Sequence, residues 1–345
     1  MAGFGEDAKW VVDYTEGGAP YGPTWAEMRE GNERMDAGAP RARAKSILRL
    51  AMSTLAPANS EIDVGRVVRL GDGLSRKAFG AVVEVSPDPS GLSGAYVVLL
   101  PGRDATPDLD LRARQEIRLL HRLSKYELPF RIPKVLGAWP ESGHRVVVRS
   151  FLKGVELDMR AGRQRGVRPW EVIAQLASAI HQLGAADFAD LLPGHATCQA
   201  HGEASLQIFE GLDAPEARDA LAWAQCHLPP PAPAVLLHGD LFGQNILLSP
   251  GEPPGLIDWE YASRGDPAED LAIVTDGVRR PFQIDGKLTR LLDAYSRIGG
   301  IPLEPARVHF HEICHLAAGY RESLNSNVGD EMLSRLRSLL RRLEG

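Results

Sequence analysis

Hydrophobic residues follow different spacings in different parts of the chain, and each spacing predicts a type of element. Over 41–56 they recur every three or four residues, which predicts an amphipathic helix. Over 63–101 short β-branched runs are separated by glycine- and proline-rich turns, which is typical of an antiparallel meander. The expected strands of the meander and the elements that follow it are Val64–Leu70, Phe79–Val85, Ala95–Leu100, a helix over Leu111–Leu123 and a strand over Arg145–Phe151.

After residue 155 the helical spacing dominates, so we expect a second, mainly helical part. Pro169 marks one helix start. Short apolar runs at 234–237 and 245–248 interrupt the helices and predict a small β insert. The pattern predicts an α+β protein with three parts: an N-terminal extension with the amphipathic helix over 1–60, a β-rich lobe over 61–153 and a helical lobe over 154–345.

Composition restricts the class of protein further. Of the 345 residues 44% are hydrophobic and 24% are charged, which excludes wholesale disorder, a coiled coil and collagen. The net charge of −6 shows no basic excess, so no nucleic-acid partner is expected. Three cysteines are too few for a disulfide framework, and no apolar run approaches the roughly 18 residues of a membrane span. We expect a cytoplasmic monomer or homodimer that does not enter a membrane.

The residues with the clearest chemical pattern lie at 237–247, in the sequence LHGDLFGQNIL. Asp240 and Asn245 stand five residues apart on a turn between two apolar runs, and Asp258 follows in GLIDWE. Phosphoryl transfer needs Mg²⁺ held against the phosphates and a carboxylate directed at the attacking hydroxyl. A carboxylate and an amide oxygen suit Mg²⁺, because they leave room for phosphate oxygens and water. These residue types in this order therefore indicate a phosphotransferase.

The same segments resemble motifs of the aminoglycoside phosphotransferase family. HGDLFGQNILL is similar to its catalytic loop, IDWE to its metal-binding segment, and GDPAEDLA at 265–272 to the stretch that follows. Together these motifs cover about 35 residues in the family's order. The resemblance implies a protein-kinase-like, two-lobed α+β fold, with an antiparallel β-sheet in the N-lobe and a mainly helical C-lobe. It also implies ATP or GTP as donor and Mg²⁺ as cofactor.

Carried over to this chain, the resemblance assigns roles to residues of the helical lobe. Asp240 would be the catalytic base, Asn245 and Asp258 would bind Mg²⁺, and His238 would support the loop. Asp270 would brace the catalytic region rather than contact substrate.

The resemblance also assigns the nucleotide site to the β-rich lobe. The glycine loop GDGLSRKAFG at 71–80 would cover the phosphates with its backbone N–H groups. Glu116 matches the helix glutamate that pairs with a strand lysine, and the backbone near Arg149–Phe151 would meet the base. The residues implied to bind the nucleotide are Gly71, Gly73, Ser75, Arg76, Lys77, Glu116, Arg149, Ser150 and Phe151.

One position departs from the family's pattern. The third strand reads YVVLLP, with Leu99 near the place where the family has a lysine or arginine. Arg76, Lys77 or Arg103 could supply the missing cation, and the hypothesis adopted is Lys77, paired with Glu116. Without any such cation, nucleotide binding would be weak and the protein a degenerate relative.

A competing motif lies at 311–315, where HEICH matches the H-E-x-x-H pattern of zinc hydrolases. Two histidines four residues apart do share a helix face, and the glutamate could act as a base. The pattern is short, however, and no third ligand follows at the expected spacing. We therefore favour a packed or substrate-facing helix over a zinc centre.

The expected activity is transfer of the γ-phosphoryl group to a hydroxyl of a small molecule. Residues 61–155 carry a formal charge of +4 and residues 156–345 carry −9, which suits an anionic nucleotide in one lobe and a cationic acceptor in the other. An aminoglycoside or similar antibiotic is the leading acceptor, with antibiotic resistance as the implied role. The alternatives are another small-molecule kinase, acting on an amino alcohol, a sugar or a macrolide, and a pseudokinase that binds ligand without turnover.

Overall fold

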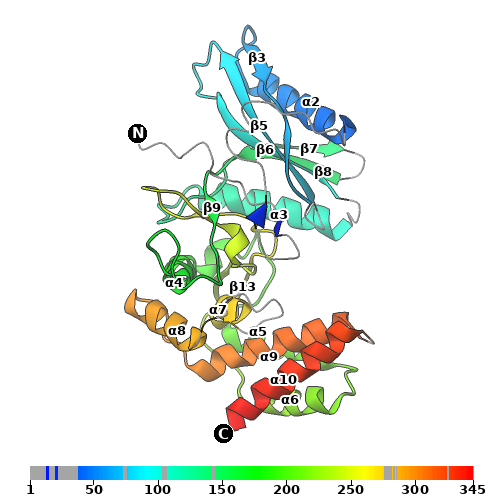
Figure 1. Ribbon diagram of the computed structural model, residues 1–345, viewed down its shortest axis with the longest axis vertical. Coiled ribbons are helices and arrows are strands. Elements are labelled where there is room, and N and C mark those ends of the chain that lie inside the picture. The colour runs from blue at the N-terminus through cyan, green and yellow to red at the C-terminus, as the bar shows by residue number, and fades with distance from the viewer. Residues whose placement is uncertain are drawn as a thin grey trace. The chain divides into compact units, whose positions relative to one another are not determined.

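The chain folds into two compact units, each described separately (Figure 1). The computed structural model describes 38–72, 76–102, 107–141, 144–275, 282, 284, 286–324 and 326–344, with the short strands β1 (Asp13–Tyr14) and β2 (Pro20–Tyr21). The first unit is Met1–Glu156 with Leu247–Ile257, and the second is Leu157–Ile246 with Asp258–Gly345. The sequence places all of 154–345 in one lobe, whereas the structure returns Leu247–Ile257 to the first unit.

The first unit is built on an antiparallel sheet with the strand order β3-β5-β6-β8-β7, and β4 also pairs with β5. Its strands are β3 (Glu61–Val64), β4 (Val68–Asp72), β5 (Arg76–Ser86), β6 (Gly94–Pro101), β7 (Val135–Glu141) and β8 (His144–Ser150). The expected meander is present, but its first strand is divided at 65–67. Strand β7 was not expected; it carries Pro140, which is tolerated because β7 lies at the sheet edge.

The two faces of this sheet contact different helices. Phe79 lies opposite Val98, which lies opposite Val148, and this face packs on α2 (Gly38–Leu55), which runs along the sheet in Figure 1. Leu48 of α2 is fully buried in the resulting core. On the other face Leu99 lies between Ala78 and Val147, and α3 (Pro107–Leu123) supplies Glu116.

A second small sheet explains why Leu247–Ile257 belongs to the first unit. Its order is β12-β11-β9, with β9 (Val155–Glu156), β11 (Ile246–Leu248) and β12 (Gly255–Leu256). Arg131 fixes the far end of this segment: its N–H donates to the carbonyl of Pro254 at 2.8 Å, and its carbonyl accepts from the N–H of Leu256 at 2.8 Å.

The second unit is mainly helical, as expected. Its helices are α4 (Pro169–His181), α5 (Cys198–Ser205), α6 (Pro215–Cys226), α7 (Ala268–Thr275), α8 (Lys287–Arg297), α9 (Pro305–Glu322) and α10 (Asn327–Glu344), with short 3₁₀ turns η1 (Ala185–Phe188), η2 (Leu206–Phe209) and η3 (Gly243–Asn245). Proline begins α4, α6 and α9, where its missing N–H costs no helical hydrogen bond. Strands β10 (Val235–Leu237) and β13 (Ser263–Gly265) pair with each other. Among the described helices, none is long and apolar enough to cross a membrane.

The packing of α2 predicts unequal effects for two leucines of that helix. Leu48→Ala should lower the free energy of unfolding by about 2–5 kcal/mol, because a fully buried side chain is removed from the core. Leu50 of the same helix is 57% exposed, so Leu50→Ala should change the free energy of unfolding by less than about 0.5 kcal/mol. Urea denaturation of the three proteins measures both values; equal losses would contradict this packing.

Candidate active site

The turn between β10 and β11 holds Asp240 in a fixed orientation. The Asn245 side-chain Nδ2 donates to the Asp240 carboxylate Oδ2 and to its backbone carbonyl, each at 2.8 Å. Asp240 is only 9% exposed, so its carboxylate has little freedom to rotate. Of the described side chains, only Asn245 bonds the carboxylate, which leaves Oδ1 available to accept a proton.

His238 and Gly239 shape the backbone before Asp240. The buried His238 ring packs on Trp259, with 4.6 Å between ring centroids, and its Nδ1 accepts the Asp240 N–H at 3.2 Å. Gly239 has φ +78°, and a Cβ at this position would lie 2.3 Å from the carbonyl oxygen of Tyr261. The turn therefore requires glycine at 239, and the expected supporting role of His238 agrees with its contacts.

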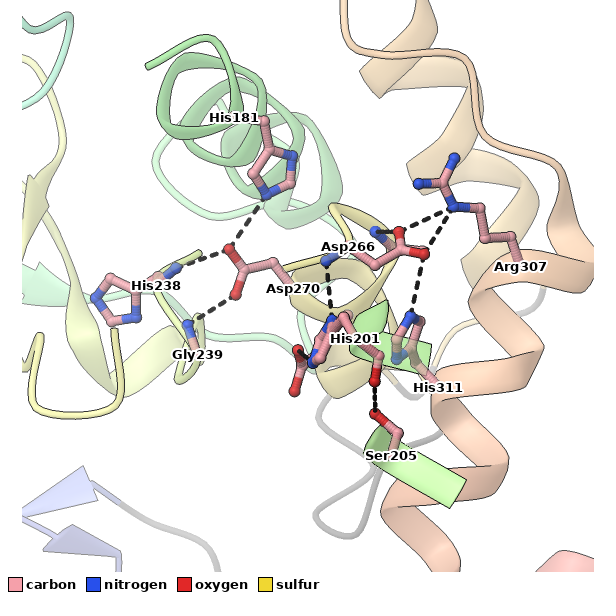
Figure 2. Close-up of polar contacts among 11 residues, drawn as sticks. His181, His201, Ser205, His238, Gly239, Asp266, Asp270, Arg307 and His311 are labelled. Atoms are coloured by element: carbon pink, nitrogen blue, oxygen red, sulfur yellow. Dashed lines mark hydrogen bonds and ion pairs between the residues drawn. The ribbon is translucent and has the colours of Figure 1, made fainter. Parts of the chain in front are cut away.

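Asp270 of α7 fixes this turn through hydrogen bonds to its backbone (Figure 2). Its Oδ2 accepts the N–H of His238 at 2.9 Å and its Oδ1 accepts the N–H of Gly239 at 2.8 Å. His181 of α4 adds a third contact, 3.2 Å from Nε2 to Oδ2. A carboxylate only accepts hydrogen bonds, so Nε2 carries a proton, and Nδ1 lies 2.7 Å from the Tyr295 hydroxyl oxygen. Asp270 thus braces the turn, and the expectation that it does not contact substrate stays a prediction.

Asn245 and Asp258 carry donor atoms of the kind that Mg²⁺ prefers. The Asn245 nitrogen is occupied by Asp240, so its carbonyl oxygen Oδ1 is the atom directed elsewhere. Asp258 adopts φ +67°, a conformation that an aspartate rarely takes and that is concentrated at functional sites. One carboxylate oxygen and one amide oxygen fit Mg²⁺.

In the first unit, Glu116 forms ion pairs with two arginines from two strands. Its Oε2 lies 2.9 Å from Arg76 Nη1 and its Oε1 lies 3.2 Å from Arg149 Nη1. Glu116 is 2% exposed and Arg149 is 9% exposed, so the group is buried. Glu116 pairs with Arg76 and Arg149 instead of the expected Lys77, because alternation along β5 places Lys77 on the face of Phe79 and Arg76 on the opposite face, with Glu116.

Some of the other residues expected to bind the nucleotide are described by the structure, and others are not. Gly71 lies in β4, whereas Gly73, Ser75 and Arg103 fall outside the described residues. The N–H of Ser150 donates to the carbonyl of Lys134 at 2.8 Å, and that of Phe151 donates to the carbonyl of Ala95 at 2.9 Å. These two N–H groups therefore complete the sheet of the first unit.

His311 and Glu312 of the HEICH segment, which lies in α9, contact other residues of the second unit. His311 Nε2 lies 3.4 Å from Asp266 Oδ2, and Glu312 accepts from His309 at 2.6 Å and from the hydroxyl of Thr275. Within the described part of the chain, no three His, Cys, Asp or Glu side chains are grouped so that they could hold a metal ion. The packed-helix interpretation therefore agrees with the contacts of α9.

Asp266 and Glu269 anchor a second buried network in the same unit. Arg307 Nε donates to both oxygens of Asp266, at 2.9 and 2.8 Å, and His201 Nδ1 accepts the Asp266 N–H at 2.9 Å (Figure 2). His201 Nε2 lies 3.0 Å from Glu269 Oε2. Burial raises the pKa of Asp266, but hydrogen bonds and charges from His311 and Arg307 outweigh it and lower the pKa to about 2.

The pKa of Glu269 is also lowered. Burial raises it, whereas the hydrogen bond and charge of His201 lower it more, to about 2. Burial lowers the pKa of His201, but its bond to Glu269 outweighs this and raises the pKa above its usual value. The pair is therefore most stable when the carboxylate is ionised and the imidazole is protonated.

Sequence reasoning missed His181, Tyr295, His201 and Arg307, which complete these networks. Each lies in a helical stretch, or between helices, far from the motif it supports. A single buried polar residue in an amphipathic helix gives no local signal of its partner, so no pattern in the chain identifies these four.

Comparisons with known proteins indicate the family and the fold of the chain. A sequence model of the phosphotransferase enzyme family matches residues 84–310. Homoserine kinase of Methylobacterium nodulans is 29% identical over 177 residues, 48% of this chain and 52% of that protein. Homoserine kinase of Parvibaculum lavamentivorans is 30% identical over 187 residues, 51% of this chain and 54% of that protein. The chain thus spans about half the length of the curated relatives it matches.

Solved structures show the fold. The macrolide 2′-phosphotransferase MphH of Brachybacterium faecium is 21% identical, with a TM-score of 0.60, and the match covers 85% of this chain and 98% of that one. The GDP complex of aminoglycoside 2′-phosphotransferase-IIIa is 16% identical, with a TM-score of 0.61 and coverage of 87% and 99%. These matches confirm the expected protein-kinase-like α+β fold class.

The network around Asp266, Glu269 and His201 predicts a defined pH range of greatest stability. The lowered carboxyl pKa values contribute stability above about pH 4.5, and this is lost as pH falls towards 2. For Asp266 alone the loss is on the order of 2 kcal/mol. The raised pKa of His201 contributes stability below about pH 6.5. This contribution is lost as pH rises through the pKa that His201 has in the folded protein.

Urea denaturation between pH 3 and pH 9 measures this dependence. His201→Gln should lower stability most between about pH 4.5 and 6.5 and flatten the profile above that range, whereas His227→Gln, at an exposed histidine, should leave its shape unchanged. A His201→Gln profile parallel to that of the wild type would contradict the assignment.

Proposed function

Because the chain belongs to the phosphotransferase enzyme family, we propose that it transfers the γ-phosphoryl group of ATP or GTP to a hydroxyl of a small molecule. The observation that carries this proposal is the Asp240 carboxylate, whose Oδ2 is held by Asn245 while Oδ1 is left to accept a proton. Phosphoryl transfer requires such a group beside the attacking hydroxyl.

Asp240 orients the acceptor hydroxyl and accepts its proton late in the reaction, as the new O–P bond forms and the bond to the leaving nucleoside diphosphate breaks. Its orientation is fixed before the acceptor arrives, which lowers the entropic part of the barrier. Asn245 and Asp258 would hold Mg²⁺, which would neutralise charge on the phosphates.

The proposed nucleotide site lies in the first unit. Within the described residues, Arg76, Glu116 and Arg149 supply charge to this site. The chain near Ser150 and Phe151 contacts the base. Solved relatives in complex with GDP, ADP or AMP-PNP support a nucleoside polyphosphate as donor.

We propose an acceptor that carries both a hydroxyl and an ammonium group. The chain's relatives by sequence are homoserine kinases, named for an amino alcohol with both groups, and solved relatives hold kanamycin or hygromycin B. The formal charge of −9 over residues 156–345 suits such a cation. The sequence relatives favour a small amino alcohol, and an aminoglycoside antibiotic is the second candidate. We propose that the protein acts in the cytoplasm, with ATP as its donor.

A screen for product tests the proposal directly. Amino alcohols including homoserine, aminoglycosides, macrolides and sugars are incubated with ATP and Mg²⁺, and new phosphomonoesters are detected by ³¹P NMR. Asp240→Asn should lower kcat roughly 10²–10⁴-fold with little change in ATP affinity, because it removes only the proton acceptor. Asp219→Asn, at an exposed carboxylate of α6, is the matched control and should match the wild type.

Two outcomes would overturn the proposal. Binding of ATP without a phosphorylated product from any acceptor class would instead favour the pseudokinase. Equal rates for the wild type and Asp240→Asn would remove Asp240 from the reaction.

A further inference from the structure

Arg131 contacts segments of the first unit that lie far apart in the chain. We propose that Arg131, together with Ser249, is a positioning residue for the nucleotide base: both side chains hold the carbonyl of Lys153 and thereby fix the peptide groups of 150–153, beside which the base is proposed to bind. This inference rests on the proposed function, since it requires a nucleotide, but it concerns the base and not the transfer step.

The guanidinium group of Arg131 has an acceptor at each of its nitrogens. Nε donates to the carbonyl of Pro253 at 2.9 Å, and Nη2 donates to the carbonyl of Lys153 at 3.0 Å. Nη1 lies 2.7 Å from Oε2 of Glu252. Because the guanidinium is planar and the directions of its N–H groups are fixed, these contacts set the position of Lys153 relative to 252–253.

A second side chain holds the same carbonyl. Ser249 follows β11 and is 9% exposed, and its hydroxyl donates to the carbonyl of Lys153 at 2.8 Å. A carbonyl oxygen has two lone pairs, so Arg131 and Ser249 together use both. Lys153 lies between β8 and β9, so no strand fixes this carbonyl and the two side chains do so instead.

Leu152 carries the peptide groups that this arrangement leaves to a ligand. The N–H groups of Ser150 and Phe151 are bonded within the sheet, whereas among the described residues neither the N–H nor the carbonyl of Leu152 has a hydrogen-bond partner. Leu152 is half-buried. Main-chain groups that are removed from water need partners, and the edge of a nucleotide base offers both donors and acceptors. Leu152 directly precedes Lys153, so fixing Lys153 restricts the direction of the Leu152 groups.

The bonds to main-chain carbonyls, and not the ion pair, give Arg131 this role. Glu252 is 49% exposed, and an ion pair at the surface contributes little to stability and is screened by salt. The Arg131 side chain is only 23% exposed. Loss of the Glu252 charge should therefore leave Lys153 in place, whereas loss of the guanidinium should not.

Titration of the full chain with ATP, and separately with inorganic tripolyphosphate, each with Mg²⁺, tests the assignment without any acceptor. Arg131→Ala keeps its main-chain bonds to Pro254 and Leu256, and it should weaken ATP binding roughly 5- to 10-fold, because a hydrogen bond to the base is misdirected. Tripolyphosphate has no base and should bind this variant as it binds the wild type. Arg131→Lys should recover part of the loss, because a single ammonium reaches fewer acceptors.

Two further variants isolate the Lys153 carbonyl. Ser249→Ala removes its other donor and should lower ATP affinity roughly 2- to 5-fold, again without a change for tripolyphosphate. Glu252→Gln removes only the exposed ion pair of Arg131, so it is the matched control and should leave both affinities unchanged.

The two ligands separate this inference from the proposed function. Unchanged ATP affinity in Arg131→Ala, an equal loss for tripolyphosphate, or an equal loss of ATP affinity in Glu252→Gln would overturn the role of Arg131. A wild type that binds ATP no better than tripolyphosphate would overturn it as well. Melting curves identify a variant that is unfolded, and Arg131→Lys then carries the test. A wild type that binds ATP but phosphorylates no acceptor contradicts the proposed function and leaves the Arg131 assignment intact.

Discussion

The fully buried carboxylate of Asp270 is the contact on which the candidate active site depends. It accepts two consecutive backbone N–H groups, from His238 and Gly239, and the ring N–H of His181. Hydrogen bonds to an ionised acceptor are the strong ones in a protein, and a buried acceptor without them would be very costly. The turn that contains Asp240 is therefore held in place by the contacts of Asp270.

Both units use one buried carboxylate to orient the groups around it. In the second unit Asp270 orients a backbone turn, and in the first unit Glu116 orients two guanidinium groups. In each case the anion is paired before any ligand arrives. Orientation established during folding does not have to be established again at each turnover, which is the advantage of a preorganised site.

The local parts of this site were visible in the sequence. Asp240 and Asn245 are five residues apart, so their contact depends only on the turn between them. The choice between Arg76 and Lys77 was not visible, because successive strand residues face opposite sides of a sheet and the registry of β5 with β6 decides which faces Glu116. The wrong pairing of Lys77 follows from that one-residue ambiguity.

The long-range contacts could not be predicted from the sequence, because their partners lie far apart in the chain. His181 and Tyr295 are 114 residues apart, and neither lies in a motif. Strand β7 escaped notice because Gly137 and Pro140 interrupt its alternation, which an edge strand tolerates. The elements themselves were predicted well, since the hydrophobic spacing is a local property.

Substitution of Asp270 by asparagine tests the central claim most directly. The amide has nearly the shape of the carboxylate, but its NH₂ group would face either the N–H of Gly239 or the donors from His238 and His181. The account predicts faster hydrogen exchange at the Gly239 amide, ATP affinity close to that of the wild type, and transfer slowed by roughly 100-fold, since a turn displaced by about 1 Å misdirects Asp240. Unchanged exchange at Gly239 together with unchanged transfer would contradict it.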